Sequence, residues 1–215
     1  MNPQRHHLIY LYPDADFSIN SLHADKVAIE KQVLGWLLQG LPCIYAKQSY
    51  GNTINLGLPL LHNNKKHRVA LQVAPSAVQQ QQVLPQLKQM QDFFLCCYGI
   101  EELDVFLDLQ HVSDIAVYGS FLFHYLSGQP FVNENSDLDL LINYQRYSLT
   151  DLQEFIALLA KKMNRTIDGE IRFPKFGDVS IKELLDLSAK KLLCKSKDKP
   201  ALLSRTELYE YYPLQ

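Results

Sequence analysis

Apolar positions recur with two different periods in this sequence, and the pattern divides the chain into two parts. In the first part, apolar residues three and four positions apart predict a helix over residues 24–39, which ends at Gly40 and Pro42. Short apolar runs bounded by turn residues predict strands around this helix, at residues 8–12, 43–47, 53–58 and 68–73. The first part is therefore expected to be a small α/β domain.

A change of composition follows this first part. Residues 74–85 contain two prolines and four consecutive glutamines. We interpret the segment as a linker, although the glutamines could also begin the helix that is expected to continue through residues 90–98. The predicted domains are residues 1–78 and residues 79–215.

The second part alternates strands and helices. Apolar runs predict strands at residues 114–118, 137–142, 166–171, 178–181 and 191–195. Helical spacing predicts helices at residues 121–127, 148–163 and 183–190. Ser148 stands three residues before Asp151, which is the spacing of a capping box at the start of the second helix. The whole chain is expected to have α/β or α+β architecture.

Composition and charge exclude several classes of protein. Of the 215 residues, 47% are apolar and 20% are charged, as in folded globular proteins. No apolar run approaches the ~20 residues of a membrane span. The formal net charge of −2 argues against a nucleic-acid-binding protein. The N-terminus has no signal-peptide core, so we expect a cytoplasmic protein with no membrane partner.

Two short motifs in the second part carry the candidate chemistry. Gly119-Ser120 lies between an expected strand and an expected helix, where backbone N–H groups and a hydroxyl can bind a phosphate. After a spacer of sixteen residues, Asp137 and Asp139 lie in an expected strand, on the face opposite to Leu138. Two carboxylates this close repel each other unless a cation lies between them, and Mg²⁺ prefers such oxygen ligands.

Each motif alone has a plain structural explanation. An isolated Asp-x-Asp is usually a solvated turn, and an isolated Gly-Ser pair carries even less information. Here the two motifs agree in order, spacing and secondary structure with what phosphoryl or nucleotidyl transfer needs, which is a positioned phosphate and neutralised charge at phosphorus. We therefore predict a metal-dependent transferase with Asp137 and Asp139 as metal ligands.

The two motifs resemble the signature of the nucleotidyltransferase superfamily, which is Gly-Ser, a spacer, Asp-x-Asp and a later third carboxylate. More narrowly, the chain is similar to the phosphoribosyl-dephospho-CoA transferases, the holo-acyl-carrier-protein synthases of malonate decarboxylase. The resemblance is strongest in five segments: VYGSFLFHYLSGQPF (117–131), SDLDLL (136–141), IDGEIRFP (167–174), VSIKEL (179–184) and LLCKS (192–196). Weaker matches extend it over nearly the whole chain.

The resemblance implies a fold, a reaction and a set of roles. The fold would be a nucleotidyltransferase domain with a mixed sheet, after a small N-terminal α/β domain. The donor would be triphosphoribosyl-dephospho-CoA and the acceptor a serine on the acyl-carrier subunit of malonate decarboxylase, with diphosphate as the second product. Asp137 and Asp139 would hold Mg²⁺, while Gly119 and Ser120 would hold the triphosphate.

The third carboxylate would come from the segment Asp168-Gly169-Glu170. Asp168 is our first choice and Glu170 the second, and a plain Asp-Gly hairpin turn is the structural alternative. Lys182 and Lys195 would contact phosphate, although each alone is more often a solvated lysine. The chain departs from the family's pattern at three places, which are His6-His7, Lys47 and Ile181.

A basic segment lies near the C-terminus of this slightly acidic chain. Its five lysines are Lys190, Lys191, Lys195, Lys197 and Lys199. They are expected either to dock an acidic carrier protein or to form an ordinary solvated surface.

Two other classes of function stay open at this point. One is a nucleotidyltransferase that moves a nucleoside monophosphate onto a small molecule or another protein, since such enzymes share both motifs. The other is a non-catalytic binding module that keeps the fold and has lost turnover. Retention of Gly119, Ser120, Asp137 and Asp139 together argues against the second.

Overall fold

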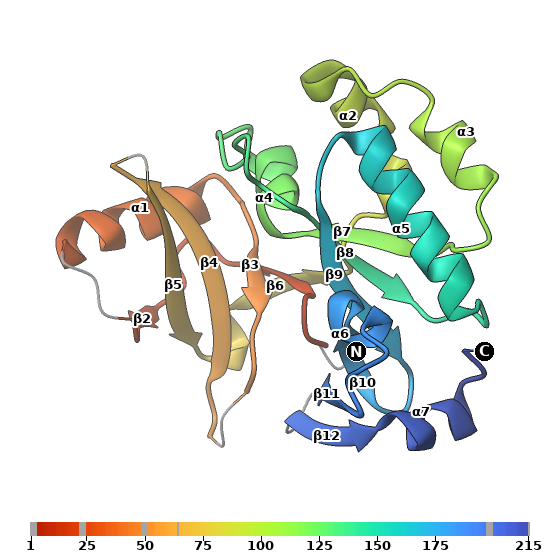
Figure 1. Cartoon of the computed structure of the whole chain (residues 1–215). Coiled ribbons are helices and arrows are strands. Elements are labelled where there is room, and N and C mark those ends of the chain that lie inside the picture. The colour runs from red at the N-terminus through yellow and green to blue at the C-terminus, as the bar shows by residue number, and fades with distance from the viewer. Residues whose placement is uncertain (1–3, 22–24, 49–50, 64, 197–199, 215) are drawn as a thin grey trace. The chain divides into compact units, whose positions relative to one another are not determined.

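A computed structural model describes residues 4–21, 25–48, 51–63, 65–196 and 200–214 (Figure 1). The chain divides into two compact units, residues 1–84 and residues 85–215. Each unit contains one six-stranded sheet within the described residues. In the described part of the chain, no helix has the length and the apolar character needed to cross a membrane.

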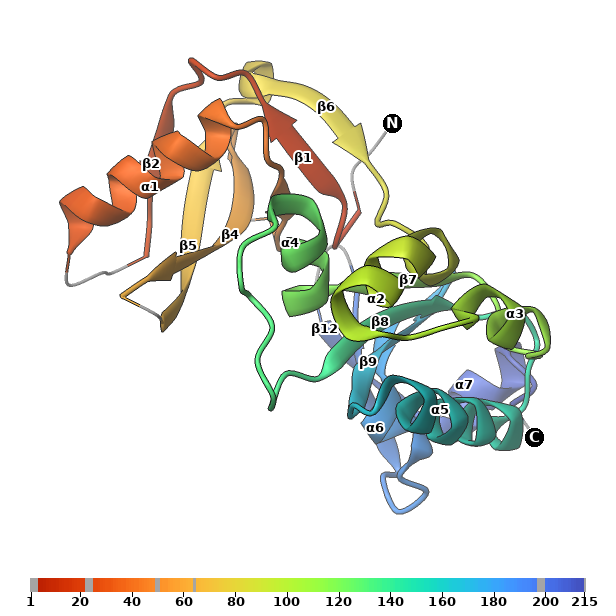
Figure 2. The same ribbon diagram turned by 90° about the horizontal axis from the view of Figure 1, so that it is seen from above.

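The first unit consists of an antiparallel sheet and one helix. The strand order is β2-β5-β4-β3-β1-β6. These strands are β1 (Leu8–Leu11), β2 (Phe17–Ile19), β3 (Cys43–Tyr45), β4 (Ile54–His62), β5 (Lys65–Val73) and β6 (Val78–Gln82). Helix α1 (Lys26–Leu38) packs on this sheet through Ile29, Val33, Trp36 and Leu37, all of which are buried (Figure 2). A short 3₁₀ helix, η1 (Pro75–Ala77), precedes β6.

The second unit contains a mixed sheet with the order β12-β11-β10-β9-β8-β7. These strands are β7 (Ile115–Tyr118), β8 (Leu138–Asn143), β9 (Ile167–Phe173), β10 (Gly177–Ser180), β11 (Lys191–Lys195) and β12 (Pro200–Ser204). Among the described strands of this sheet only the β8–β9 pair is parallel, and helix α5 (Leu149–Met163) makes the crossover between these two strands. The predicted mixed α/β architecture is therefore confirmed.

Helices cover one face of the mixed sheet. They are η2 (Leu87–Met90), α2 (Gln91–Tyr98), α3 (Leu103–Asp108), α4 (Gly119–Ser127), α5, α6 (Ile181–Leu185) and α7 (Arg205–Tyr211), and all contribute side chains to one hydrophobic core. The capping box predicted at Ser148 is present, because the Ser148 hydroxyl accepts from the Asp151 N–H at 3.0 Å and the Asp151 carboxylate accepts from the Ser148 N–H at 2.9 Å. This cap fixes where α5 begins after β8.

Strand β8 directs three apolar side chains into the core, as its sequence predicts. Leu138, Leu140 and Ile142 are buried in the core. Asp139 is only partly buried and lies on the opposite face, because successive side chains of a strand alternate. Asp137 comes immediately before the strand.

The domain boundary lies six residues later than expected. Residues 79–82 were interpreted as a linker or a helix start, and they are instead strand β6. This strand pairs with β1 through Leu8 and Gln82, among other positions, so it belongs to the first sheet. The chain therefore divides after Leu84 and not after Val78.

The helix expected over residues 183–190 is also shorter than predicted, since α6 ends at Leu185. The Asp186 carboxylate accepts from the Ser188 N–H at 3.0 Å and from the Ser188 hydroxyl at 2.7 Å. A short polar side chain that binds the backbone two residues ahead favours a turn over another helical turn.

Candidate active site

The turn from β7 into α4 brings Gly119 against Asp139. Gly119 begins α4 with φ +68°, in the left-handed region that favours glycine. A Cβ atom at position 119 would lie 2.0 Å from Oδ2 of Asp139, so only glycine leaves room for this carboxylate. The side chain of Tyr118 does not cap the first turn of α4. The Gly-Ser motif and the Asp-x-Asp motif thus meet at one point in the fold.

A second carboxylate lies directly beside Asp139. Tyr118 of β7 pairs with Asp139 of β8, and Asp139 pairs with Asp168 of β9. Paired strands lie about 4.8 Å apart, so the two aspartates are near neighbours on one face of the sheet. We call the end of the sheet formed by Gly119, Asp137, Asp139 and Asp168 the carboxylate edge.

The Asp168-Gly169-Glu170 segment is part of a strand and not a hairpin turn. All three residues lie in β9, and Gly169 pairs with Leu140 in the parallel ladder. Gly169 has φ +142°, and a Cβ atom there would lie 2.0 Å from the carbonyl oxygen of Leu140. Glycine therefore permits the close approach of β9 to β8 that sets Asp168 beside Asp139.

Lys182 of α6 reaches the carboxylate edge. Its Nζ atom donates to Oδ2 of Asp168 at 2.7 Å, with the lysine side chain 58% exposed and the aspartate 32% exposed. This hydrogen bond, together with the negative charges of Asp168 and the two neighbouring aspartates, raises the pKa of the Lys182 ammonium. The predicted phosphate-binding lysine thus lies at the site, where it contacts a carboxylate.

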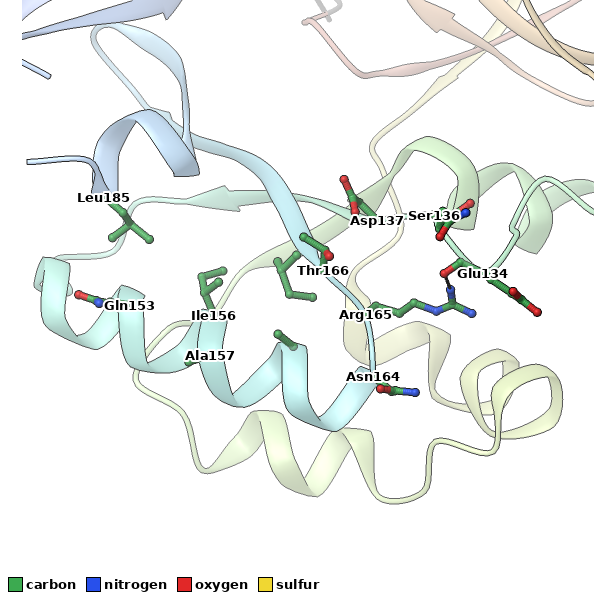
Figure 3. A pocket seen from close by; sticks show the side chains of 13 residues that line it. Glu134, Ser136, Asp137, Gln153, Ile156, Ala157, Asn164, Arg165, Thr166 and Leu185 are labelled. Atoms are coloured by element: carbon green, nitrogen blue, oxygen red, sulfur yellow. Dashed lines mark hydrogen bonds between the residues drawn. The ribbon is translucent and has the colours of Figure 1, made fainter. Parts of the chain in front are cut away.

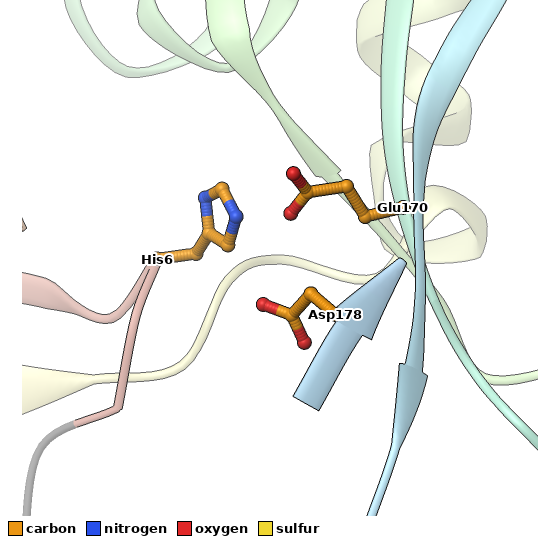
Figure 4. Close-up of side chains that lie close together, drawn as sticks. All are labelled: His6, Glu170 and Asp178. Atoms are coloured by element: carbon orange, nitrogen blue, oxygen red, sulfur yellow. The ribbon is translucent and has the colours of Figure 1, made fainter. Parts of the chain in front are cut away.

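Glu170 lies one step further into the sheet than Asp168, on the same face. Lys195 of β11 donates to Oε1 of Glu170 at 2.7 Å. Figure 4 shows Glu170 and Asp178 projecting from the neighbouring strands β9 and β10. Arg172 binds Asp178 through two hydrogen bonds of 2.7 and 2.9 Å. Glu170 is therefore paired with Lys195 beside the carboxylate edge, and Asp168 is the closer partner of Asp139.

Hydrogen bonds hold the loop of residues 133–136, which leads to Asp137. The side chain of Asn133 accepts from the Asn135 N–H at 3.0 Å, and the Ser136 hydroxyl accepts from the Asn133 N–H at 3.0 Å. Arg165 donates to the carbonyl oxygen of Asn133 at 2.9 Å and also to that of Glu134. Asn133, Asn135 and Arg165 were not predicted from the sequence as part of the site. The run of Asn and Ser before Asp137 is a turn signal, but nothing local indicates its partner Arg165.

Helix α4, which carries Gly119 and Ser120, also contacts α2 near its C-terminal end. The hydroxyl of Tyr98, on α2, lies 2.6 Å from Nδ1 of His124, on α4. Burial lowers the pKa of His124, so the ring favours its neutral form. The contact fixes α4 against α2.

The carboxylate edge supplies oxygen donors of the kind that Mg²⁺ prefers. Asp137 and Asp139 could hold such an ion, with Asp168 as the third carboxylate. In the described structure the carboxylate oxygens of these three residues do not all lie within 4.8 Å of one another. Ion binding by all three carboxylates would therefore need side-chain rotation, and for Asp168 this would compete with its hydrogen bond to Lys182.

A pocket of about 800 Å³ opens beside Asp137 (Figure 3). We call it the α5 pocket, because Gln153, Ile156, Ala157 and Ala160 of that helix line one wall. The remaining lining residues are Glu134, Asn135, Ser136, Asp137, Asn164, Arg165, Thr166, Ile167 and Leu185.

Part of the basic segment lies outside the described residues, namely Lys197 and Lys199. Lys190 and Lys191 are exposed, and Lys195 is paired with Glu170. Docking of a carrier by this segment therefore stays a prediction.

Known proteins match the chain over both units. The family model for the phosphoribosyl-dephospho-CoA transferase MdcG N-terminal domain matches residues 4–83, and that for its C-terminal domain matches residues 96–206. A phosphoribosyl-dephospho-CoA transferase from Bradyrhizobium diazoefficiens is 30% identical over 210 residues, which cover 94% of this chain and 91% of the relative. One from Xanthomonas axonopodis pv. citri is 27% identical over 217 residues, covering 95% and 96%. No solved structure matches the chain.

Proposed function

This chain belongs to the phosphoribosyl-dephospho-CoA transferase family, and we propose that it modifies the acyl-carrier subunit of malonate decarboxylase. As a family member it is a transferase of the phosphoribosyl-dephospho-CoA group. The proposed donor is triphosphoribosyl-dephospho-CoA, the proposed acceptor is a serine hydroxyl of the carrier, and diphosphate is released. The reaction is proposed to depend on Mg²⁺.

One observation carries this proposal. The backbone of Gly119, at the start of a helix, lies against the carboxylate of Asp139, and Asp168 lies beside Asp139 on the next strand. A helix N-terminus attracts a phosphate, whereas clustered carboxylates attract a cation. A metal-bound triphosphate combines both charges, so this juxtaposition supports it as the ligand.

Asp137 and Asp139 are the two proposed metal ligands. Asp137 precedes β8 and Asp139 lies within it, and both contribute only oxygen donors. Bound there, Mg²⁺ would neutralise charge on the triphosphate and on the diphosphate that leaves.

The protein groups have separate tasks in the proposed transfer. The N–H groups of the first turn of α4 and the Ser120 hydroxyl bind the β- and γ-phosphates, which become the leaving diphosphate. The serine oxygen of the carrier forms a bond to the α-phosphorus, while the bond from that phosphorus to the bridging oxygen breaks and its electron pair goes to diphosphate. Asp168 accepts the serine proton. Lys182, 2.7 Å from Asp168, holds this carboxylate in place.

Intact mass spectrometry of the carrier tests the proposal. The apo carrier is incubated with the full chain, the donor and Mg²⁺, and a carrier with its serine replaced by alanine is the matched control. The expected result is a mass gain equal to the prosthetic group on the wild-type carrier only. No gain with a folded enzyme would refute the proposal. Diphosphate release from ATP in the absence of carrier would point instead to transfer of a nucleoside monophosphate.

A further inference from the structure

Asp137 and Asp139 are held in place by different parts of the structure. Asp139 lies within β8 and is paired on both sides, with Tyr118 of β7 and with Asp168 of β9. The described pairs of β8 with its two neighbours begin no earlier than Leu138, one residue after Asp137. The strand ladder therefore fixes Asp139, whereas the loop before β8 sets the position of Asp137.

This loop is a turn with several internal hydrogen bonds. The Ser136 N–H donates to the carbonyl oxygen of Asn133 at 3.1 Å. The Ser136 hydroxyl accepts from the Asn133 N–H, and the Asn133 side chain accepts from the Asn135 N–H, each at 3.0 Å. Bonds within a turn set its shape, but they cannot fix its place against the sheet.

Two consecutive residues, Arg165 and Thr166, attach the chain to the start of β9 on both sides of Asp137 (Figure 3). Before Asp137, Nη1 of Arg165 donates to the carbonyl oxygens of residues 133 and 134, the first at 2.9 Å. After Asp137, the Leu138 N–H donates to the carbonyl oxygen of Thr166 at 2.9 Å. The second bond continues the strand ladder, so Arg165 supplies the side-chain contact that holds the turn.

Displacement of Asp137 would matter for the proposed metal. The pKa of Lys182 is raised first by its hydrogen bond to Asp168. The charges of Asp137 and Asp139 raise it further, so both carboxylates lie near this lysine. Groups that orient metal ligands typically change metal affinity by about 10–100-fold. A loop that lets Asp137 move would therefore weaken the binding of an ion shared with Asp139.

We propose that Arg165 is a positioning residue, which holds the loop of residues 133–136 against β9 so that Asp137 is set as a metal ligand. Arg165 acts through the loop backbone and touches neither the ion nor the substrate. This inference rests on the proposed function, since it uses the proposed ion at Asp137 and Asp139.

The charge of Arg165 separates this role from a direct electrostatic effect. A positive charge repels a divalent cation, so removal of a nearby guanidinium should by itself tighten metal binding. Loss of a residue that positions a ligand should weaken metal binding. The sign of the change in metal affinity therefore distinguishes the two effects.

Binding of Mn²⁺ to the full chain, measured by electron paramagnetic resonance without donor or carrier, tests the inference. Arg165→Met removes the hydrogen bonds to the turn and keeps a long side chain. Asn133→Ala disturbs the same turn and keeps the guanidinium. Lys161→Met is the matched control, because Lys161 is exposed in the last turn of α5 and its replacement also removes one positive charge. Thermal unfolding checks that each variant is folded.

The dissociation constant for Mn²⁺ should rise about tenfold in Arg165→Met and in Asn133→Ala, and should stay near wild type in Lys161→Met. The Mg²⁺ concentration that gives half of maximal turnover should rise with it, while the Michaelis constant for the carrier stays unchanged.

Three results would overturn the inference. They are unchanged or tighter Mn²⁺ binding by Arg165→Met, a loss that Asn133→Ala does not share or that Lys161→Met shares fully, and absence of Mn²⁺ binding by the wild-type chain. Absence of carrier modification by a wild-type chain that binds Mn²⁺ would refute the proposed function instead, and the Mn²⁺ comparison would still decide the role of Arg165.

Discussion

Replacement of Gly119 by alanine should reduce turnover by much more than its effect on stability can explain. The added Cβ atom would lie 2.0 Å from Oδ2 and 2.8 Å from Cγ of Asp139, whereas real Cβ contacts essentially never fall below 3.0 Å. The carboxylate would have to move by about 1 Å, and a displacement of ~1 Å in a catalytic site can cost about 100-fold in rate. Alanine at φ +68° adds roughly 1–2 kcal/mol of backbone strain.

Gly128 provides a control for that strain. It ends the same helix, α4, with φ +67°, and a Cβ atom there meets nothing within 4 Å. Gly128→Ala should therefore lose the same roughly 1–2 kcal/mol of stability while keeping turnover close to wild type. Gly119→Ala should lose about 100-fold in turnover in addition.

Two measurements on both variants decide the matter. Denaturant unfolding gives the loss of stability, and the initial rate of carrier modification, followed by intact mass, gives turnover. If Gly119→Ala remains folded and works within about threefold of Gly128→Ala, the position of the Asp139 carboxylate does not govern the reaction. The assignment of Gly119 and Asp139 to one catalytic site would then be wrong.

Three further predictions follow from the same sheet and its crossover helix. Asp168→Asn should reduce turnover far more than Glu170→Gln, because Asp168 lies beside Asp139 whereas Glu170 is buried one step further into the sheet; rates at saturating carrier and donor measure this. Gly169→Ala should lower the free energy of unfolding by several kcal/mol or abolish cooperative unfolding, since a Cβ atom would lie 2.0 Å from a carbonyl oxygen of β8; denaturant unfolding measures this. Ser148→Ala should lower the free energy of unfolding by about 1 kcal/mol, because the N-cap of α5 is lost. It should also raise the pKa of Asp151, because hydrogen bonds from the Ser148 N–H and hydroxyl keep that pKa low. NMR titration measures the pKa. The sign follows from the lowered pKa: the stabilisation by Asp151 is present above the ordinary carboxyl value of about 3.9 and is lost as pH falls through the folded-state value.

Each of these predictions has a contrary outcome. A larger loss for Glu170→Gln than for Asp168→Asn would move the third-carboxylate role to Glu170. Wild-type stability of Gly169→Ala would mean that β8 and β9 can separate there without cost. An unchanged Asp151 pKa in Ser148→Ala would show that the cap does not act on that carboxyl.

The parts of the candidate site that follow local rules could be predicted from the sequence. Asp139 lies on the face of β8 that is opposite to Leu138 and Leu140, because successive side chains of a strand point to alternate faces. The Ser148 capping box likewise depends on residues three apart. The Gly119-Ser120 turn was predicted from its position between a strand and a helix.

Features that depend on distant partners could not be predicted in this way. The glutamine-rich strand β6 lies at a sheet edge and is mostly exposed, so it needs no apolar alternation, and its partner β1 is about seventy residues away in sequence. Arg165 and the loop that begins at Asn133 meet only because β8 and β9 run in parallel with α5 between them. The α5 pocket depends on the same pairing.

Carrier modification by the wild-type chain and by Asp139→Asn, compared side by side, tests the central proposal most directly. Both proteins are first shown to be folded by circular dichroism, and each is incubated with apo acyl-carrier subunit, triphosphoribosyl-dephospho-CoA and Mg²⁺. The intact mass of the carrier should rise by the mass of the prosthetic group with the wild type, and should stay unchanged with Asp139→Asn, because the variant lacks the carboxylate that lies between Gly119 and Asp168. No mass gain with the wild type, or a near wild-type rate with the variant, would contradict the proposed reaction or its site.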